Sequence, residues 1–173
     1  MRTFIGIRVE PNDEVKQMLR ELDSLGYVKT VEPENLHLNL KFLGEIDQAQ
    51  EKELELRLEK LAGFGPFEVD CAGIERVPSK KMVRVVMSRC HSDKLEELRS
   101  RLRELMDDFL PGSEKDSHLT LGRVKRKPDE KLDEFVSRHS QFYVQVRVSR
   151  VELIKAELLP NGPVYSTVFS AEL

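Results

Sequence analysis

Two short motifs, far apart in the chain, each place a histidine two residues before a small hydrogen-bonding side chain. They are His37-Leu38-Asn39-Leu40 and His118-Leu119-Thr120-Leu121. In a β-strand, residues i and i+2 share a face, so each motif would present its imidazole and its polar group on one face and its leucines on the other. Lys41 continues the alternation of the first motif, and we expect it on the face of His37.

Two imidazoles around one small ligand suit the cleavage of a phosphodiester by in-line attack. One ring takes a proton from the attacking water or hydroxyl, and the other gives a proton to the leaving oxygen. Histidine has an ordinary pKa near 6.5, so near neutral pH one ring can be neutral and the other charged. Asn39 and Thr120 can donate to the non-bridging oxygens, and Lys41 would add positive charge. This chemistry requires no metal or other cofactor, and the carboxylate cluster of a magnesium site is not apparent in the sequence.

A zinc site is the main alternative for paired histidines. His37 and His118 would need a third ligand, and the remaining histidines, His91 and His139, lie outside the two motifs. We interpret His91 and His139 as surface or helix-capping residues. A lone histidine before threonine in a strand is weak evidence for catalysis, so the hypothesis depends on the motif occurring twice.

Hydrophobic periodicity predicts the elements that would carry these motifs. Strands are predicted at 3–9, 36–43, 82–88, 117–124, 142–148 and 164–170, and a further strand is predicted to begin at 67. Helices are predicted at 12–25, from Asp47, from Asp93 to Pro111-Gly112, and from about Pro128 to 138. Gln50 follows Asp47 at the interval of a capping box. The apolar phase shifts between Val148 and Val151, which suggests a bulge near Ser149.

Each half of the chain follows the order β-α-β-α-β, which predicts an internal duplication. We therefore expect a single α+β domain over residues 1–173 with two pseudo-symmetric lobes, one of about 1–80 and one of about 81–173. Their antiparallel sheets would face a central cleft that holds both histidines, with terminal strands able to cross between lobes. A cleft near a pseudo-twofold axis is a natural ligand site.

The composition is that of a globular protein with a highly charged surface. Charged residues make up 34% of the chain and hydrophobic residues 39%, and the net charge is −3. Because there is no overall basic field, contact with a polyanion must be local.

Cys71 and Cys90 share no metal-ligand spacing, and we expect two part-buried thiols in a reducing compartment. Without a signal peptide or an apolar run of membrane length, a cytoplasmic location is expected.

Longer segments around both motifs resemble a known family. Residues 35–45, Asn-Leu-His-Leu-Asn-Leu-Lys-Phe-Leu-Gly-Glu, and 118–124, His-Leu-Thr-Leu-Gly-Arg-Val, are similar to the two signatures of the LigT-like RNA 2′,3′-cyclic phosphodiesterases. These enzymes belong to the two-histidine phosphoesterase superfamily and are also called 2′-5′ RNA ligases. The beginning, Met-Arg-Thr-Phe-Ile-Gly-Ile, and the late segment Pro-Asn-Gly-Pro-Val-Tyr are similar to the family as well, so the resemblance covers essentially the whole chain.

The resemblance implies a bilobal α+β fold and hydrolysis of a terminal RNA 2′,3′-cyclic phosphate to a 2′-phosphate. It implies that His37 is the proton donor and that His118 is the proton acceptor that activates water; the symmetric motifs by themselves leave these roles open. It also implies that Arg123 binds the phosphate and that Phe42 stacks on the terminal base. Both lie five residues after their histidine, so a regular strand would turn them away, and they reach the cleft only if each strand ends or bulges.

Asn39 departs from the family pattern, which normally has threonine there. Asparagine still offers an amide donor, but its longer side chain predicts looser placement of the phosphate and slower turnover. Two other functions stay open: 2′-5′ RNA ligation as the main activity, and non-catalytic binding of an RNA end or nucleotide. The expected partner is RNA with a cyclic phosphate end, tRNA fragments among the candidates, and the expected state is a monomer without membrane association.

Overall fold

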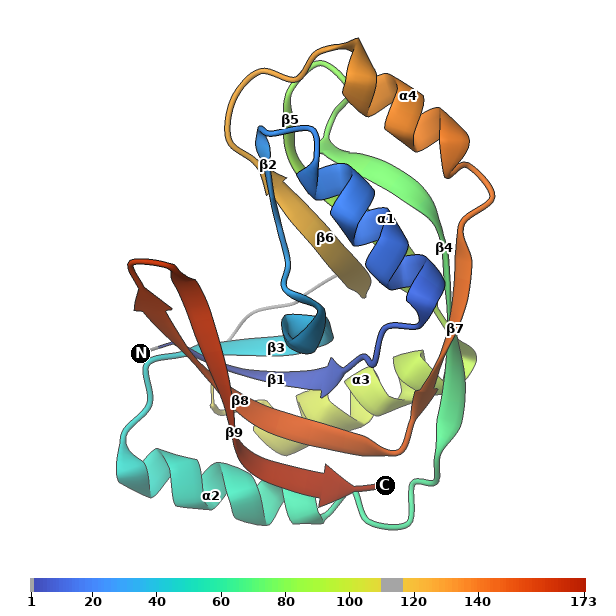
Figure 1. Cartoon of the computed structure of the whole chain (residues 1–173). Coiled ribbons are helices and arrows are strands. Elements are labelled where there is room, and N and C mark those ends of the chain that lie inside the picture. Colours follow the sequence, from blue (N-terminus) through green and yellow to red (C-terminus); the bar gives the residue numbers. More distant parts are fainter. Residues whose placement is uncertain (1, 110–116) are drawn as a thin grey trace.

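The computed structural model describes residues 2–109 and 117–173 and has the predicted α+β class (Figure 1). Its strands are β1 (Arg2–Arg8), β2 (Val28–Thr30), β3 (His37–Gly44), β4 (Phe67–Pro78), β5 (Val83–His91), β6 (His118–Val124), β7 (Tyr143–Val148), β8 (Arg150–Leu159) and β9 (Gly162–Glu172). Its helices are α1 (Asp13–Asp23), α2 (Gln48–Glu59), α3 (Asp93–Met106), α4 (Glu130–Arg138) and the short 3-10 helix η1 (Pro33–Asn35).

The described strands form one curled sheet in which every pair is antiparallel. Its order is β7-β4-β5-β6-β3-β1-β8-β9, and β2 pairs with β6 along the same edge that meets β3. The order reads symmetrically from the centre, because β6 and β3 hold the two histidine motifs and their neighbours β5 and β1 open the two halves of the chain. The two halves thus share one continuous sheet, joined where β3 meets β6.

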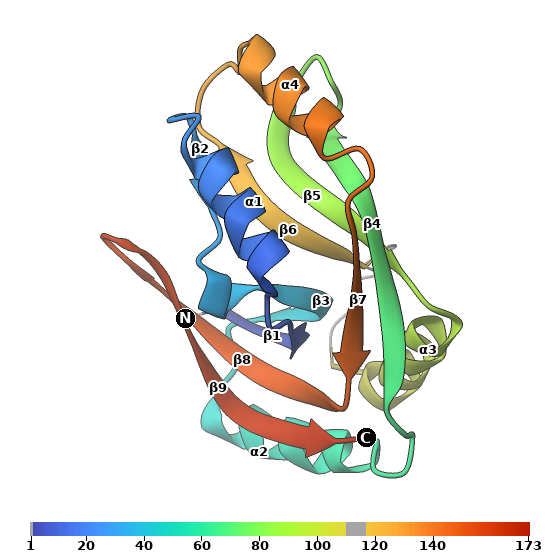
Figure 2. The same cartoon turned by 45° about the vertical axis from the view of Figure 1, so that its right-hand side comes forward.

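The four α-helices lie in two pairs. Helices α1 and α4 lie beside β2, β5 and β6 at one end of the molecule, and α2 and α3 lie at the other end, α2 near β9 and α3 near β4 (Figures 1 and 2). Sequence signals explain their bounds, since Asp47 and Gln50 form the predicted capping box of α2. Ser92 caps α3, one residue earlier than predicted. Pro111 and Gly112, predicted to end that helix, lie outside the described residues.

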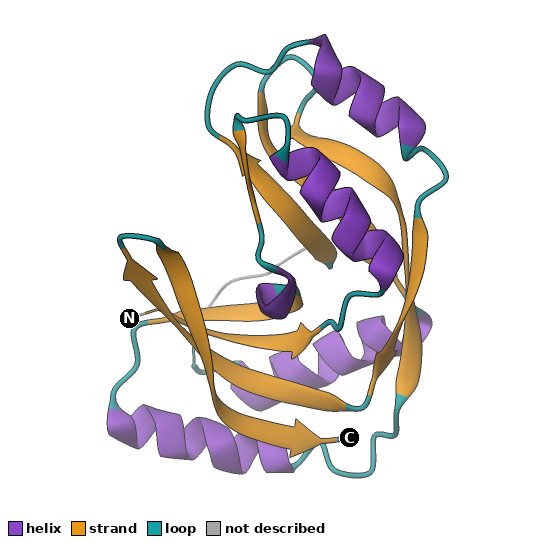
Figure 3. Ribbon diagram, viewed as in Figure 1, coloured by secondary structure: helices purple, strands orange, loops and turns teal. Residues whose placement is uncertain are grey.

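The chain passes between the two ends of the sheet more often than the sequence indicated (Figure 3). Strand β4, in the first half of the chain, pairs with β5 and β7, whereas β8, in the second half, pairs with β1 and β9. The predicted bulge near Ser149 is therefore wrong. The apolar phase changes there because β7 ends at Val148 at one edge of the sheet and β8 begins at Arg150 in the other half. The short elements β2 and η1 were not predicted.

The expectation of two free thiols is also wrong. Cys71 on β4 and Cys90 on β5 are register partners, their Cα atoms lie 4.1 Å apart, and their sulfur atoms form a disulfide. The two residues are 19 positions apart along the chain, and only the pairing of β4 with β5 brings them together. Both side chains are buried.

In the part of the chain that the structure describes, no helix combines the length and apolar character needed to span a membrane.

Candidate active site

The two histidine motifs meet in the middle of the sheet. Strands β3 and β6 pair antiparallel through Leu38 and Leu119, the residues that follow His37 and His118. Because equivalent residues of the two motifs face each other, a local twofold axis passes between them. One further step of this register places His37 beside Thr120 and Asn39 beside His118. The charge of His118 lowers the pKa of His37, as expected for neighbouring rings.

The leucines of both motifs lie on the opposite face, as predicted. Leu36, Leu38, Leu40, Leu119 and Leu121 are buried in the main hydrophobic core. His37, Asn39, His118 and Thr120 are only partly buried. We call the sheet face that carries these four side chains the site face. The alternation that the sequence predicted for both motifs is confirmed as far as Leu40 and Leu121.

After those leucines, both strands contain a bulge at the same position. Along β1, Gly6 pairs with Asn39 but Ile5 pairs with Lys41, so Leu40 is the extra residue of β3. Along β5, Met87 pairs with Thr120 but Val86 pairs with Gly122, so Leu121 is the extra residue of β6. Each bulge shifts the alternation by one residue.

This shift brings Phe42 and Arg123 onto the site face, because directly opposed residues share a face. Phe42 pairs with Phe4, and Arg123 pairs with Val85. Both side chains are exposed, Phe42 to 58%. The family resemblance thus placed both residues better than regular strand alternation did.

The same shift overturns the expected position of Lys41. It pairs with the core residue Ile5 and is only 8% exposed, so it lies on the core face of the sheet. The prediction that Lys41 shares a face with His37 and Asn39 is wrong, because the sequence does not show that Leu40 is an inserted residue.

Glycine is required at the second bulge because β2 lies close to it. A Cβ atom on Gly122 would lie 2.6 Å from a methyl carbon of Val28 and 3.2 Å from the carbonyl oxygen of Lys29. Gly6, opposite Asn39, is similarly confined, since its Cβ would lie 2.9 Å from the Leu38 carbonyl oxygen. Backbone therefore approaches backbone on both sides of the site.

A second, smaller group of buried apolar side chains lies on the site face itself, at the base of its polar side chains. Phe4, Met87 and Ile154 are buried but do not belong to the main core. Phe4 pairs with Ile154 across β1 and β8, and Met87 pairs with Thr120 across β5 and β6. This group removes water from the bases of the polar side chains, which strengthens their electrostatic interactions.

The ring of His37 is held on three sides. Its Nδ1 lies 2.6 Å from the backbone oxygen of Asn35, which accepts the Nδ1 proton, so Nε2 is free to exchange a proton with a ligand. Its centroid lies 4.8 Å from that of Phe4 and 5.2 Å from that of Tyr165, which meets it edge-on. Burial raises the pKa of Tyr165, and the charge of Arg123 opposes that rise.

Burial also lowers the pKa of His37 below its usual value. The Asn35 carbonyl and the Asn39 side chain oppose this, while the charges of Arg8 and His118 lower the pKa further. The neutral ring is therefore favoured in the free protein. A bound phosphate would reverse this, because its negative charge favours the imidazolium form.

An arginine from the next strand flanks each histidine. Arg8 pairs in register with His37, and its Nε donates to Oε2 of the buried Glu152 at 2.9 Å. Thr167 donates to the same oxygen at 3.1 Å. On the other side of the axis, Arg89 pairs with His118 and forms an ion pair of 2.8 Å with Glu75. The duplication therefore extends to the ionic surroundings of both histidines.

Sequence reasoning did not single out Tyr165, Arg8 or Glu152. Tyr165 ends the Pro-Asn-Gly-Pro-Val-Tyr segment of the family resemblance, which was the available signal, although it indicated no role. Arg8 and Glu152 are 144 residues apart, and no local pattern connects them.

Replacing Arg8 and Glu152 is expected to move the pKa of His37 in opposite directions. Arg8→Gln removes a positive charge and raises that pKa, whereas Glu152→Gln leaves Arg8 without its counter-charge and lowers it. If His37 donates a proton, kcat/KM declines as pH rises through this pKa, so the decline moves to higher pH in Arg8→Gln and to lower pH in Glu152→Gln. NMR titration of the His37 ring carbon-bound protons measures the shift directly.

Arg89→Gln is the matched control for this experiment, because it removes the equivalent charge beside His118. It should leave the His37 titration nearly unchanged. Shifts of the same sign in Arg8→Gln and Glu152→Gln would contradict the electrostatic account.

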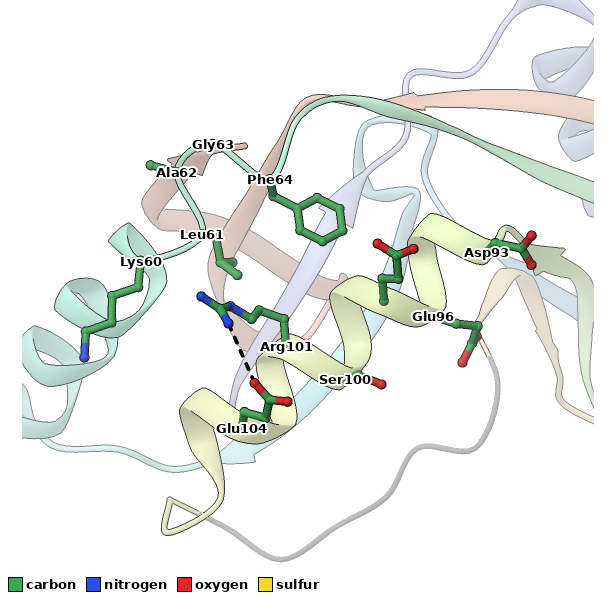
Figure 4. Close-up of a pocket in the computed structure, with 11 residues that line it drawn as sticks. Lys60, Leu61, Ala62, Gly63, Phe64, Asp93, Glu96, Ser100, Arg101 and Glu104 are labelled. Atoms are coloured by element: carbon green, nitrogen blue, oxygen red, sulfur yellow. Dashed lines mark ion pairs between the residues drawn. The ribbon is translucent and has the colours of Figure 1, made fainter.

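Other parts of the described surface offer less for a phosphate. A pocket between the end of α2 and α3 is lined by Lys60 and Arg101 but also by Asp93, Glu96 and Glu104, and neither His37 nor His118 lies in it (Figure 4). Its carboxylates would repel an anion.

Within residues 2–109 and 117–173, no three His, Cys, Asp or Glu side chains are grouped to hold a metal ion. His91 is exposed on β5, and His139 is the C-cap residue of α4, as expected.

Several known proteins are similar to this chain over nearly its whole length. A curated RNA 2′,3′-cyclic phosphodiesterase of Archaeoglobus fulgidus is 34% identical over 170 residues, which are 95% of this chain and 96% of that protein. One of Thermotoga maritima is also 34% identical and covers 99% of this chain and 95% of its own length. The crystal structure of TT0787 of Thermus thermophilus superposes with a TM-score of 0.79 at 26% identity, over 100% of this chain and 98% of that one.

The family model of the 2′-5′ RNA ligase superfamily matches residues 11–158, a segment that contains both histidine motifs and both bulged strands. The chain belongs to the 2′-5′ RNA ligase superfamily.

Proposed function

We propose that this protein hydrolyses the 2′,3′-cyclic phosphate at the end of an RNA to a 2′-phosphate. The meeting of two histidine motifs about one axis at Leu38 and Leu119 carries the proposal. Its relatives in Archaeoglobus fulgidus and Thermotoga maritima are both named RNA 2′,3′-cyclic phosphodiesterase, which supports it.

In the proposed reaction, His118 takes a proton from water, and the water oxygen attacks phosphorus. The bond from phosphorus to the 3′-oxygen breaks on the opposite side, and Nε2 of His37 protonates that oxygen. Thr120, Asn39 and Arg123 bind the non-bridging oxygens, and Phe42 stacks on the terminal base. Lys41 has no part in this scheme, because its side chain lies on the core face.

Asn39 limits how firmly the phosphate is held. Its Oδ1 is buried and has no hydrogen-bond partner among the described residues. Its amide nitrogen can donate to the phosphate, while Oδ1, which lacks a proton, favours the protonated form of the nearby His37 ring. A site with asparagine here binds the anion and still supports the proton donor, so we prefer catalysis to mere binding of an RNA end.

An RNA that ends in a 2′,3′-cyclic phosphate is expected to give a 2′-phosphate as its sole product, with or without a chelator. We expect one product because a single proton donor on one side of phosphorus protonates only one of the two ester oxygens, and the family resemblance implies that this is the 3′-oxygen. End-group analysis by enzymatic digestion and mass spectrometry separates the 2′- and 3′-phosphate products. A mixture of the two, or loss of turnover on adding chelator, would count against the proposal.

Ligation is the second candidate function, and the name of the superfamily favours it. By microscopic reversibility, the same pair of rings can join a 5′-hydroxyl to the cyclic phosphate. Water is in large excess over RNA ends, so we expect hydrolysis to be the main reaction. The yields of both products from one cyclic-phosphate RNA and a 5′-hydroxyl acceptor compare the two directly.

We further propose tRNA fragments as substrates, a monomeric state and a cytoplasmic location.

A further inference from the structure

The two sides of the site differ in charge, although the motifs themselves are nearly symmetric. After the second motif come the exposed Lys125, Arg126 and Lys127. After the first motif come Glu45 and Asp47 at comparable positions. With a net charge of −3 for the whole chain, the basic side stands out. A polyanion attached to the reacting nucleotide would therefore be attracted more strongly by the run that follows the second motif than by the one that follows the first.

Lys29 lies on that side and on the site face. Strand β2 pairs with β6 so that Lys29 is directly opposite Arg123. Opposed side chains share a face with Cβ atoms roughly 5 Å apart, and the bulge at Leu121 puts Arg123 on the face of His118 and Thr120. Lys29 is exposed, and no ion pair involves it among the residues that the structure describes. Its ammonium group is thus available to a ligand on the strand next to Arg123, the predicted phosphate-binding residue.

The opposite side of the site presents several exposed apolar side chains, together with the exposed Arg2 of β1, which pairs with Ala156 of β8. Tyr165 on β9 contacts the His37 ring and pairs with Ala156 of β8. Leu158, two residues along β8, shares that face and is 72% exposed. Phe42 is exposed on the same side. These apolar side chains suit a nucleobase better than a phosphate, which would lose its hydration against them.

We propose that Lys29 binds the phosphodiester on the 5′ side of the reacting nucleotide, so that the rest of the RNA leaves the site across β6 and β2. The inference rests on the proposed function and adds that the substrate is an RNA chain of at least two nucleotides. The terminal nucleoside lies against Phe42, and the next phosphate lies beyond Arg123. The β8–β9 hairpin does not carry the RNA chain.

Lys29→Gln is expected to lower kcat/KM roughly fivefold for a tetranucleotide with a cyclic phosphate end, the scale of one exposed ionic contact. The same substitution should leave kcat/KM unchanged for a 2′,3′-cyclic mononucleotide, which has no such phosphodiester. For the tetranucleotide, the slope of log affinity against log salt should decrease by about 0.7, because one fewer counterion contact is made on a single strand.

Lys52→Gln on α2 is the matched control, since it removes the same charge from an exposed position on another part of the surface. It should affect neither substrate. Equal losses on both substrates in Lys29→Gln, or no loss on the tetranucleotide, would overturn the inference. So would a tetranucleotide-specific loss in Leu158→Glu without one in Lys29→Gln, because the RNA would then follow the hairpin.

Failure of the proposed function would look different. If the unaltered protein cleaved neither substrate, hydrolysis would be refuted while Lys29 could still be tested. Fluorescence anisotropy with a tetranucleotide that ends in a 2′-phosphate would then compare the affinities and salt slopes of the unaltered protein, Lys29→Gln and Lys52→Gln.

Discussion

Replacing either His37 or His118 by alanine is expected to reduce turnover of a cyclic-phosphate RNA by roughly 10²–10⁴-fold, the usual contribution of one positioned proton transfer. Both rings project from the partly exposed site face and outside the main core, so the fold should survive each substitution. Single-turnover rates measure the loss, and thermal unfolding by circular dichroism checks the fold. His91→Ala, at an exposed position on β5, is the control and should retain full activity.

A change of leaving group distinguishes the proton donor from the proton acceptor. If His37 is the donor, a substrate with sulfur in place of the 3′-oxygen should restore much of the activity of His37→Ala, because a thiolate leaves with far less need of a proton. The same substrate should not rescue His118→Ala, which lacks the acceptor for the water proton. Rescue of His118→Ala alone would interchange the roles, and full activity in either alanine variant would remove the paired-histidine mechanism.

Replacing Arg123 by glutamine is expected to lower kcat/KM by about 10- to 100-fold. Hydrogen bonds to a charged group contribute roughly 1.5–3 kcal/mol, and the bulge at Leu121 places the guanidinium on the site face beyond Thr120. Arg123→Lys keeps the charge but loses the two-pronged geometry, so its activity should lie between the two. Steady-state kinetics and the Kd of a 2′-nucleotide product measure both effects.

Arg84→Gln is the control for Arg123. Arg84 is exposed on β5, immediately before the register partner of Arg123, and it is not itself paired with β6. It should have little effect on kcat/KM for a cyclic mononucleotide. A similar loss in both variants would show that general surface charge matters and that the bulge does not.

The bulges at Leu40 and Leu121 have the same effect on which later side chains reach the site face. A histidine and the residue two positions later share a face in any strand, but a third group five positions later does not. One inserted residue in each motif, Leu40 and Leu121, corrects this and adds Phe42 on one side and Arg123 on the other. The duplicated site therefore gains different chemistry at equivalent positions.

The sequence by itself determined the four α-helices, most of the strands, and the faces of the two motifs as far as Leu40 and Leu121. Leu36 and Leu38 beside His37, and Leu119 and Leu121 after His118, are enough to anchor one face of each strand, because side chains alternate by covalent geometry. The capping box of Asp47 and Gln50 likewise depends on neighbours in sequence. The family resemblance added the positions of Phe42 and Arg123, which alternation alone would have turned away.

The tertiary structure decided what depends on distant strands. An inserted residue is visible only against a partner strand, so the burial of Lys41 required the register of β1 and β3. The Cys71–Cys90 bond required β4 to lie beside β5. The contacts of Arg8 with Glu152 and the alignment of Lys29 with Arg123 arise because strands from opposite ends of the chain pair. Local periodicity fixes which way a side chain points, whereas only strand pairing fixes what it meets.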